Sequence, residues 1–218
     1  MKILLVLGLQ FIVIILTCNV KDEQPSHHKK PRPEACGSHG VCKCGPDEEY
    51  YEVNCRNRTY KVVPRNILPN ATKIVLSENA LEYMPENAFA NTPNVTVINL
   101  TVNSLTKVPM KLFAGTVLLK YLSIGGNHLE ELPPGLLANA PNLEFIILSH
   151  NKLTSVPADL FKNKHKLSVI SLEKNNLHQL SPTMLSSTPN IKKMFLGSNR
   201  IREIPDGFFN HTPKLQYL

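Results

Sequence analysis

Four cysteines near the N-terminus are the residues of this 218-residue chain with the most distinctive chemistry. Cys36, Cys42, Cys44 and Cys55 lie within twenty residues, and Cys18 is the fifth and last cysteine. Four cysteines this close can bind zinc as thiolates or form two disulfides. The chain begins with an export signal, described below, which favours disulfides over zinc. Their spacing alone leaves all three pairings open.

Histidines and carboxylates are the next candidates for chemistry, but they form no recognisable constellation. The histidines are scattered along the chain, and Glu130 and Glu131 are adjacent carboxylates expected to be solvated. The sequence contains no phosphate-binding loop, metal-ligand run or dinucleotide motif. We therefore expect no enzyme activity, no cofactor and no metal. The scattered histidines are His128, His150, His165, His178 and His211.

Five Asn residues match the Asn-X-Thr pattern that accepts N-linked glycans in exported proteins. In each case Thr follows at the second place and no Pro intervenes. Most of them are predicted to carry glycans, and Asn99 would place its glycan on the sheet described below. The five residues are Asn57, Asn70, Asn94, Asn99 and Asn210.

The first 18 residues have the pattern of a secretory signal peptide. Lys2 gives a positive start, and residues 3–16 are almost continuously apolar. This run is too short for a comfortable membrane span, so we predict cleavage near Cys18, with a retained signal anchor as the alternative. No second long apolar run follows, so no membrane span is expected and the protein should be secreted or extracellular.

Residues 19–35 are predicted to be a disordered basic lead-in. They contain several prolines together with Lys29, Lys30 and Arg32, and they lack hydrophobic periodicity. The whole chain has a formal net charge of +7. A basic protein can bind nucleic acid, anionic matrix polysaccharide or a membrane surface, or the charge can serve solubility alone. No motif typical of nucleic-acid recognition is visible, so nucleic acid is not an expected partner.

Most of the chain is a repeat that must position these residues. Residues 71–214 divide into six coils of 24 residues without any insertion. In residues 143–153, Leu-Glu-Phe-Ile-Ile-Leu-Ser-His-Asn-Lys-Leu, positions 1, 4, 6 and 11 are apolar and position 9 is Asn. This pattern is the leucine-rich repeat template. The Asn residues at position 9 are Asn79, Asn103, Asn127, Asn151, Asn175 and Asn199.

The coil pattern predicts an α/β solenoid. Apolar residues at positions 4 and 6 suit a short strand that turns both side chains inward. We therefore expect a curved horseshoe with short parallel strands on the concave face and irregular or short helical arcs on the convex face. Each repeated Asn should pair with inward-pointing backbone groups at the turn after its strand, as a structural ladder without chemistry.

The cysteine cluster followed by 24-residue coils resembles the extracellular, typical leucine-rich repeat family with a cysteine-rich N-terminal cap. The resemblance covers residues 36–218. It implies a cap at residues 36–70, with Cys36 paired to Cys44 and Cys42 paired to Cys55. Residues 132–139, Leu-Pro-Pro-Gly-Leu-Leu-Ala-Asn, further resemble the group of leucine-rich alpha-2-glycoprotein and the beta-type phospholipase A2 inhibitors.

The end of the chain gives a further expectation. Residues 215–218 fit the start of a seventh repeat, and no terminal cap follows. A solenoid needs a cap at each end of its core. The chain is therefore expected to be a fragment of a longer protein.

The resemblance implies a binding protein. We expect a secreted glycoprotein that holds a protein ligand on its concave sheet; the alternatives are the ectodomain of a membrane receptor and an inhibitor of a secreted enzyme such as a phospholipase. Positions 3, 5 and 7 of each strand should face outward. An apolar stripe there indicates an interaction site, or else side chains that only stabilise the sheet. The predicted ligand-binding residues are Val97, Tyr121, Phe145, Ile147, Val169, Lys193 and Phe195.

Overall fold

The computed structural model describes residues 34–36, of which only the backbone is considered, and residues 42–46, 51–64 and 67–218. The predicted signal peptide at 1–18 and nearly all of the predicted lead-in at 19–35 lie outside these residues.

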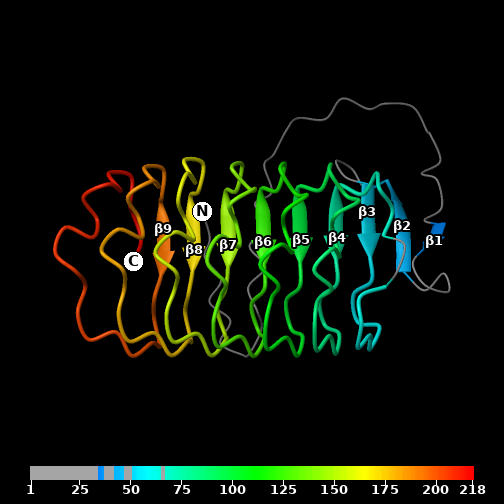
Figure 1. The fold of residues 1–218 in the computed structure, drawn as a ribbon, viewed down its shortest axis with the longest axis horizontal. Helices are drawn as coiled ribbons and strands as arrows, with labels where there is room; N and C mark the ends of the chain where they lie inside the picture. The colour runs from blue at the N-terminus through cyan, green and yellow to red at the C-terminus, as the bar shows by residue number, and fades with distance from the viewer. Residues whose placement is uncertain (1–33, 37–41, 47–50, 65–66) are drawn as a thin grey trace, which may run out of the picture. The chain divides into compact units, whose positions relative to one another are not determined.

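Nine strands form one sheet in which each strand neighbours the next in chain order (Figure 1). The first three strands pair antiparallel, and all later pairs are parallel. The predicted parallel-strand solenoid is therefore confirmed. The strands are β1 (Glu34–Cys36), β2 (Cys42–Pro46), β3 (Tyr51–Asn54), β4 (Lys73–Val75), β5 (Val97–Asn99), β6 (Tyr121–Ser123), β7 (Phe145–Ile147), β8 (Val169–Ser171) and β9 (Lys193–Phe195).

The arcs that connect the parallel strands are irregular. They consist of turns, and the described residues contain no helix. Of the two forms expected for the arcs, these residues therefore show the irregular one.

The interior of the coils is a continuous apolar core. Ile98 and Leu100, at positions 4 and 6 of their coil, have no exposed surface, and the same positions are buried in nearly every other coil. On the arc side, Phe89 and Phe113 are buried and stack in parallel with ring centroids 6.1 Å apart. Burial of this apolar surface is the main force that holds one coil on the next.

The Asn side chains at position 9 bond backbone groups of two neighbouring coils, and we call this row the Asn ladder. Asn127 donates from Nδ2 to the carbonyl of Ile124 in its own coil and to that of Leu100 in the preceding coil, at 3.0 and 3.1 Å. Its Oδ1 accepts from the backbone N–H of Leu105 at 3.0 Å. Asn103, Asn151 and Asn175 make the same three kinds of bond.

A second row of polar side chains lies in the arcs, at position 22, and we call it the Thr row. Thr92, Thr116, Thr188 and Thr212 each donate from Oγ1 to the carbonyl three residues earlier, at 2.9–3.0 Å. Two coils depart from this pattern. Ala140 occupies the position in one, and Lys164 occupies it in another with only 1% of its surface exposed.

Lys164 satisfies its buried ammonium group locally. Its Nζ donates to the carbonyl of Lys162 at 3.0 Å. Burial disfavours the charged form and lowers the pKa of Lys164. This coil therefore carries a cationic group where most of the others carry a hydroxyl.

Candidate functional site

The outward row at position 3 is continuous across the sheet. Strand register places Val97, Tyr121, Phe145, Val169 and Lys193 side by side on β5 to β9. All five side chains are half-buried. The structure thus brings the predicted position-3 residues together in one row.

Two aromatic rings occupy the middle of this row. Tyr121 and Phe145 lie with ring centroids 6.2 Å apart and planes tilted by 38°, within the range of favourable aromatic pairs. Burial raises the pKa of the Tyr121 hydroxyl, and a hydrogen bond with Ser123 opposes that rise. Tyr121 therefore keeps its proton at neutral pH and can act as a hydrogen-bond donor beside an apolar surface.

The row continues beyond β9 to Tyr217, which the sequence analysis did not name. The backbone of Tyr217 forms a parallel bridge with Lys193, and the Lys193 ammonium lies 5.0 Å from the Tyr217 ring centroid. This distance suits a cation–π contact, and the ring remains 58% exposed. The signal was available, because Tyr217 stands 24 residues after Lys193.

The second outward row, at position 5, is less accessible than expected. Ile147 and Phe195 are half-buried, but Val75, Ser123 and Ser171 are at most 7% exposed. Ser123 lies between the larger side chains of Asn99 and Ile147 on the neighbouring strands, and it is hydrogen-bonded through its hydroxyl to Thr101 at 2.8 Å. A small residue between larger neighbours is covered by them, so only Ile147 and Phe195 add apolar surface in this row.

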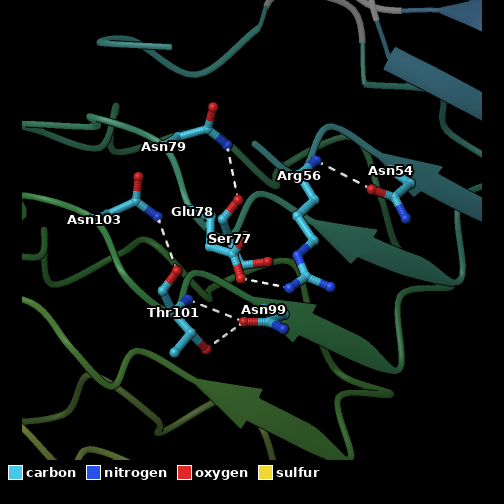
Figure 2. Close-up of polar contacts among 8 residues, drawn as sticks. All are labelled: Asn54, Arg56, Ser77, Glu78, Asn79, Asn99, Thr101 and Asn103. Atoms are coloured by element: carbon cyan, nitrogen blue, oxygen red, sulfur yellow. Dashed lines mark hydrogen bonds and ion pairs between the residues drawn. The ribbon is translucent and has the colours of Figure 1, made fainter. Parts of the chain in front are cut away.

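At the N-terminal end the same face becomes polar. Lys73 and Glu52 form an ion pair at 3.1 Å. Figure 2 shows Arg56 bonded to Glu78 through its guanidinium and to Asn54 Oδ1 through its backbone N–H. The bond and the charge of Glu78 raise the pKa of Arg56. The apolar row is therefore bounded on this side by paired charges.

Asn99, one of the predicted glycan acceptors, lies at this boundary. Its Oδ1 accepts from the backbone N–H of Thr101 at 2.9 Å and from the Thr101 hydroxyl (Figure 2). Asn99 is half-buried, whereas the other four predicted acceptors are exposed. Glycosylation of these residues stays a prediction.

The described cysteines are oxidised. Cys42 and Cys55 form the predicted disulfide, with Cα atoms 4.5 Å apart, and Cys44 is also disulfide-bonded. The predicted partner of Cys44 is Cys36, whose side chain lies outside the described residues. In the described part of the chain, no group of three or more His, Cys, Asp or Glu side chains could hold a metal ion.

The candidate catalytic groups remain apart. Four of the histidines named above, together with Glu130 and Glu131, are exposed on different coils. His150 is half-buried; burial lowers its pKa, repulsion from Lys174 lowers it further, and attraction to Glu173 opposes both. Among the described residues, none of the helical segments that a membrane crossing requires is found.

Comparison with known proteins supports the fold assignment. A model of the family described as leucine rich repeat matches residues 69–129, 93–153 and 141–201. A solved chain of the Toll–Spatzle complex, a molecular hub in Drosophila development and innate immunity, is 34% identical to this protein with a TM-score of 0.63. The likeness covers 66% of this chain and 20% of the other, so it spans about a fifth of that chain's length.

No curated protein matches the chain, so the closer resemblance to leucine-rich alpha-2-glycoprotein and the beta-type phospholipase A2 inhibitors has no support from these comparisons. The repeat model, by contrast, matches residues 69–201 taken together, which is more than half of the 218 residues. The protein belongs to the leucine-rich repeat family.

Proposed function

We propose that the outward face of the sheet binds a protein ligand, with Tyr121 and Phe145 as the central contacts. The observation that carries this proposal is the unbroken half-exposed row from Val97 to Val169, with an aromatic pair at its middle. Tyr and other aromatic residues are enriched among the residues that dominate protein interfaces. Lys193 and the paired charges beside β4 supply a polar rim.

The setting proposed for this binding is extracellular. The disulfide between Cys42 and Cys55 is typical of exported proteins, and the signal-peptide pattern at 1–18 agrees with export. A secreted glycoprotein is the first form of the proposal. The second is a piece of a receptor ectodomain, which the likeness to a chain of the Toll–Spatzle complex favours.

The test combines capture with loss of binding. A photo-crosslinking amino acid at Phe145 should capture a protein partner from extracellular fluid, whereas the same amino acid at Tyr83, an exposed aromatic position away from the sheet, should not. The captured protein is then purified and titrated against wild type and the Tyr121→Ser, Phe145→Ser double variant. Loss of two central aromatic contacts should weaken binding roughly 30-fold or more.

Tyr83→Ser is the matched control, because it removes an exposed aromatic ring from the arc. It should bind like wild type. If the double variant folds normally and binds the captured protein as tightly as Tyr83→Ser does, the sheet face is not the ligand-binding surface.

A further inference from the structure

Charge is distributed unequally over the two segments of each coil that flank the strand. The segment after the turn, at positions 12–17, is mainly acidic across the six coils: its carboxylates are Glu82, Glu86, Glu130, Glu131, Asp159, Glu203 and Asp206. The segment that leads into each strand, at positions 20–24 and 2, has Glu144 as its one carboxylate. Five lysines of this leading segment are exposed, and we call them the basic flank: Lys120, Lys162, Lys166, Lys192 and Lys214.

Two lysines of the basic flank are held in place by the coil before them. Lys166 Nζ donates to Asn142 Oδ1 at 2.8 Å, and Lys214 Nζ donates to Asn190 Oδ1 at 2.6 Å. Each Asn is itself fixed, because its Nδ2 donates to a backbone carbonyl of the next coil back, at 3.0 and 2.6 Å. Fixing an ammonium group before binding lowers the entropy lost when it contacts a ligand.

These ammonium groups keep their charge available. The described ion pairs of the chain involve Arg56, Lys61 and Lys73, and none includes a lysine of the basic flank. An ammonium group has three donors, so the Asn contact leaves two for a ligand. The flank can therefore offer both net charge and hydrogen bonds to an anion.

The spacing of the flank suits an extended polyanion. Lys166 and Lys214 occupy the same position two coils apart, which corresponds to about 10 Å at a strand separation of about 4.8 Å. Lys192 stands on the coil between them, at position 2. A chain of anionic groups lying across the coils would meet one of these lysines at every step.

The predicted glycan acceptors leave this part of the flank open. Asn70 and Asn94 stand at the position that Lys166 and Lys214 occupy in later coils, so glycans there would cover only its N-terminal portion. Between residues 100 and 209 the sequence has no acceptor pattern. The lysine-rich portion, from Lys162 to Lys192, lies inside this interval.

We propose that the basic flank binds a sulfated polysaccharide, at a site separate from the protein-binding face proposed above. Residues 20–24 of the six coils contain no Phe, Tyr or Trp, so the flank lacks the aromatic platforms that single-stranded nucleic acids stack on. Sulfate groups need only charge and hydrogen-bond donors, which the lysines supply. The extracellular setting argued from the disulfide is also where sulfated polysaccharides are found.

The test measures heparin binding by the full chain at several salt concentrations. The Lys166→Glu, Lys214→Glu variant should bind heparin roughly tenfold more weakly or worse, since two attractive contacts become repulsive. The matched control is Lys107→Glu, Lys111→Glu, which makes the same charge change on exposed lysines of positions 12–17. It should stay within about twofold of wild type, because its charges lie off the flank and are screened by salt.

Other results would overturn the proposal. Equal loss in both variants would mean that net charge alone governs binding, and loss confined to a Lys29→Glu, Lys30→Glu variant would place the site in the N-terminal segment. Equal binding of desulfated heparin, or tighter binding of an RNA oligonucleotide or of phosphatidylserine vesicles, would exclude a sulfate-selective site. Melting temperatures check folding; if the Glu variant is destabilised, Lys166→Gln, Lys214→Gln replaces it and should weaken binding in the same direction.

Discussion

The Asn ladder beside the sheet and the Thr row in the arcs both bring buried polar side chains to backbone carbonyls, but they differ in reach. Asn127 bonds a carbonyl 27 residues earlier as well as one in its own coil. Thr116 bonds only the carbonyl of Phe113, three residues earlier. The ladder joins coils, whereas the Thr row closes a turn within one coil. This difference explains why the ladder position is always Asn, while the Thr position also accepts Ala140 and Lys164.

The largest expected effect comes from breaking the ladder. Asn127→Ala should lower the free energy of unfolding by about 3 kcal/mol or more, because it leaves buried backbone groups of two coils without partners at about 1–3 kcal/mol each. Urea titration of wild type and variant measures this difference. Asn139→Ala, at an exposed position in an arc, is the control and should change stability by less than about 0.5 kcal/mol. Similar losses in the two variants would contradict the role given to the ladder.

An intermediate effect, of opposite sign, is expected at Lys164. Lys164→Met keeps an unbranched side chain and removes the buried charge, so it should stabilise the protein at pH 7 by about 1–2 kcal/mol. Its pKa is lowered in the folded state, so the unfolded chain binds more protons at pH values between the folded and unfolded pKa. Wild-type stability therefore rises with pH in that window.

The advantage of Lys164→Met should accordingly be complete at neutral pH and shrink as the pH approaches the ordinary lysine value of about 10.4. Urea titrations at pH 7 and at alkaline pH measure this change. An advantage that grows with pH would show that the cationic form of Lys164 is not the source of the cost.

The smallest effect is expected for the Thr row. Thr116→Val keeps the shape of the side chain and removes its hydroxyl, so the Phe113 carbonyl keeps its bond from the Thr116 backbone N–H at 3.2 Å. The expected loss is about 0.5–1.5 kcal/mol, the usual net value of one hydrogen bond. If thermal and urea unfolding show a loss as large as that of Asn127→Ala, the distinction between the two rows fails.

Periodicity made much of the architecture predictable. A constant step of 24 residues gave the parallel strands, the inward apolar positions and the Asn column, because each coil must repeat the geometry of its neighbour. The same column reasoning, carried one coil further, would have reached Tyr217. The pairing of Cys42 with Cys55 came from the family resemblance and not from spacing, since the spacing allowed other pairings.

Features set by individual neighbours were not predictable. Ser123 is covered because larger residues flank it on both adjacent strands, and no property of Ser itself indicates this. Val102 holds a left-handed backbone with φ of 55°, an unfavourable conformation for a β-branched residue, because position 8 of every coil has positive φ. The register also changes between cap and coils: Glu52 pairs with Lys73, 21 residues later, while later strands step by 24.

The uniform coil length has a consequence for how such a gene can change. Asn103 bonds the carbonyl of Leu76, and Asn127 bonds that of Leu100, in the same relation one coil apart. A recombination event that joined Val102 directly to Asn127 would delete one coil and bring Asn127 to the carbonyl that Asn103 now uses. Duplication of a coil would be equally neutral to its neighbours. The ligand-binding row and the basic flank can therefore lengthen or shorten by whole coils during evolution while the bonds that hold the coils together stay the same.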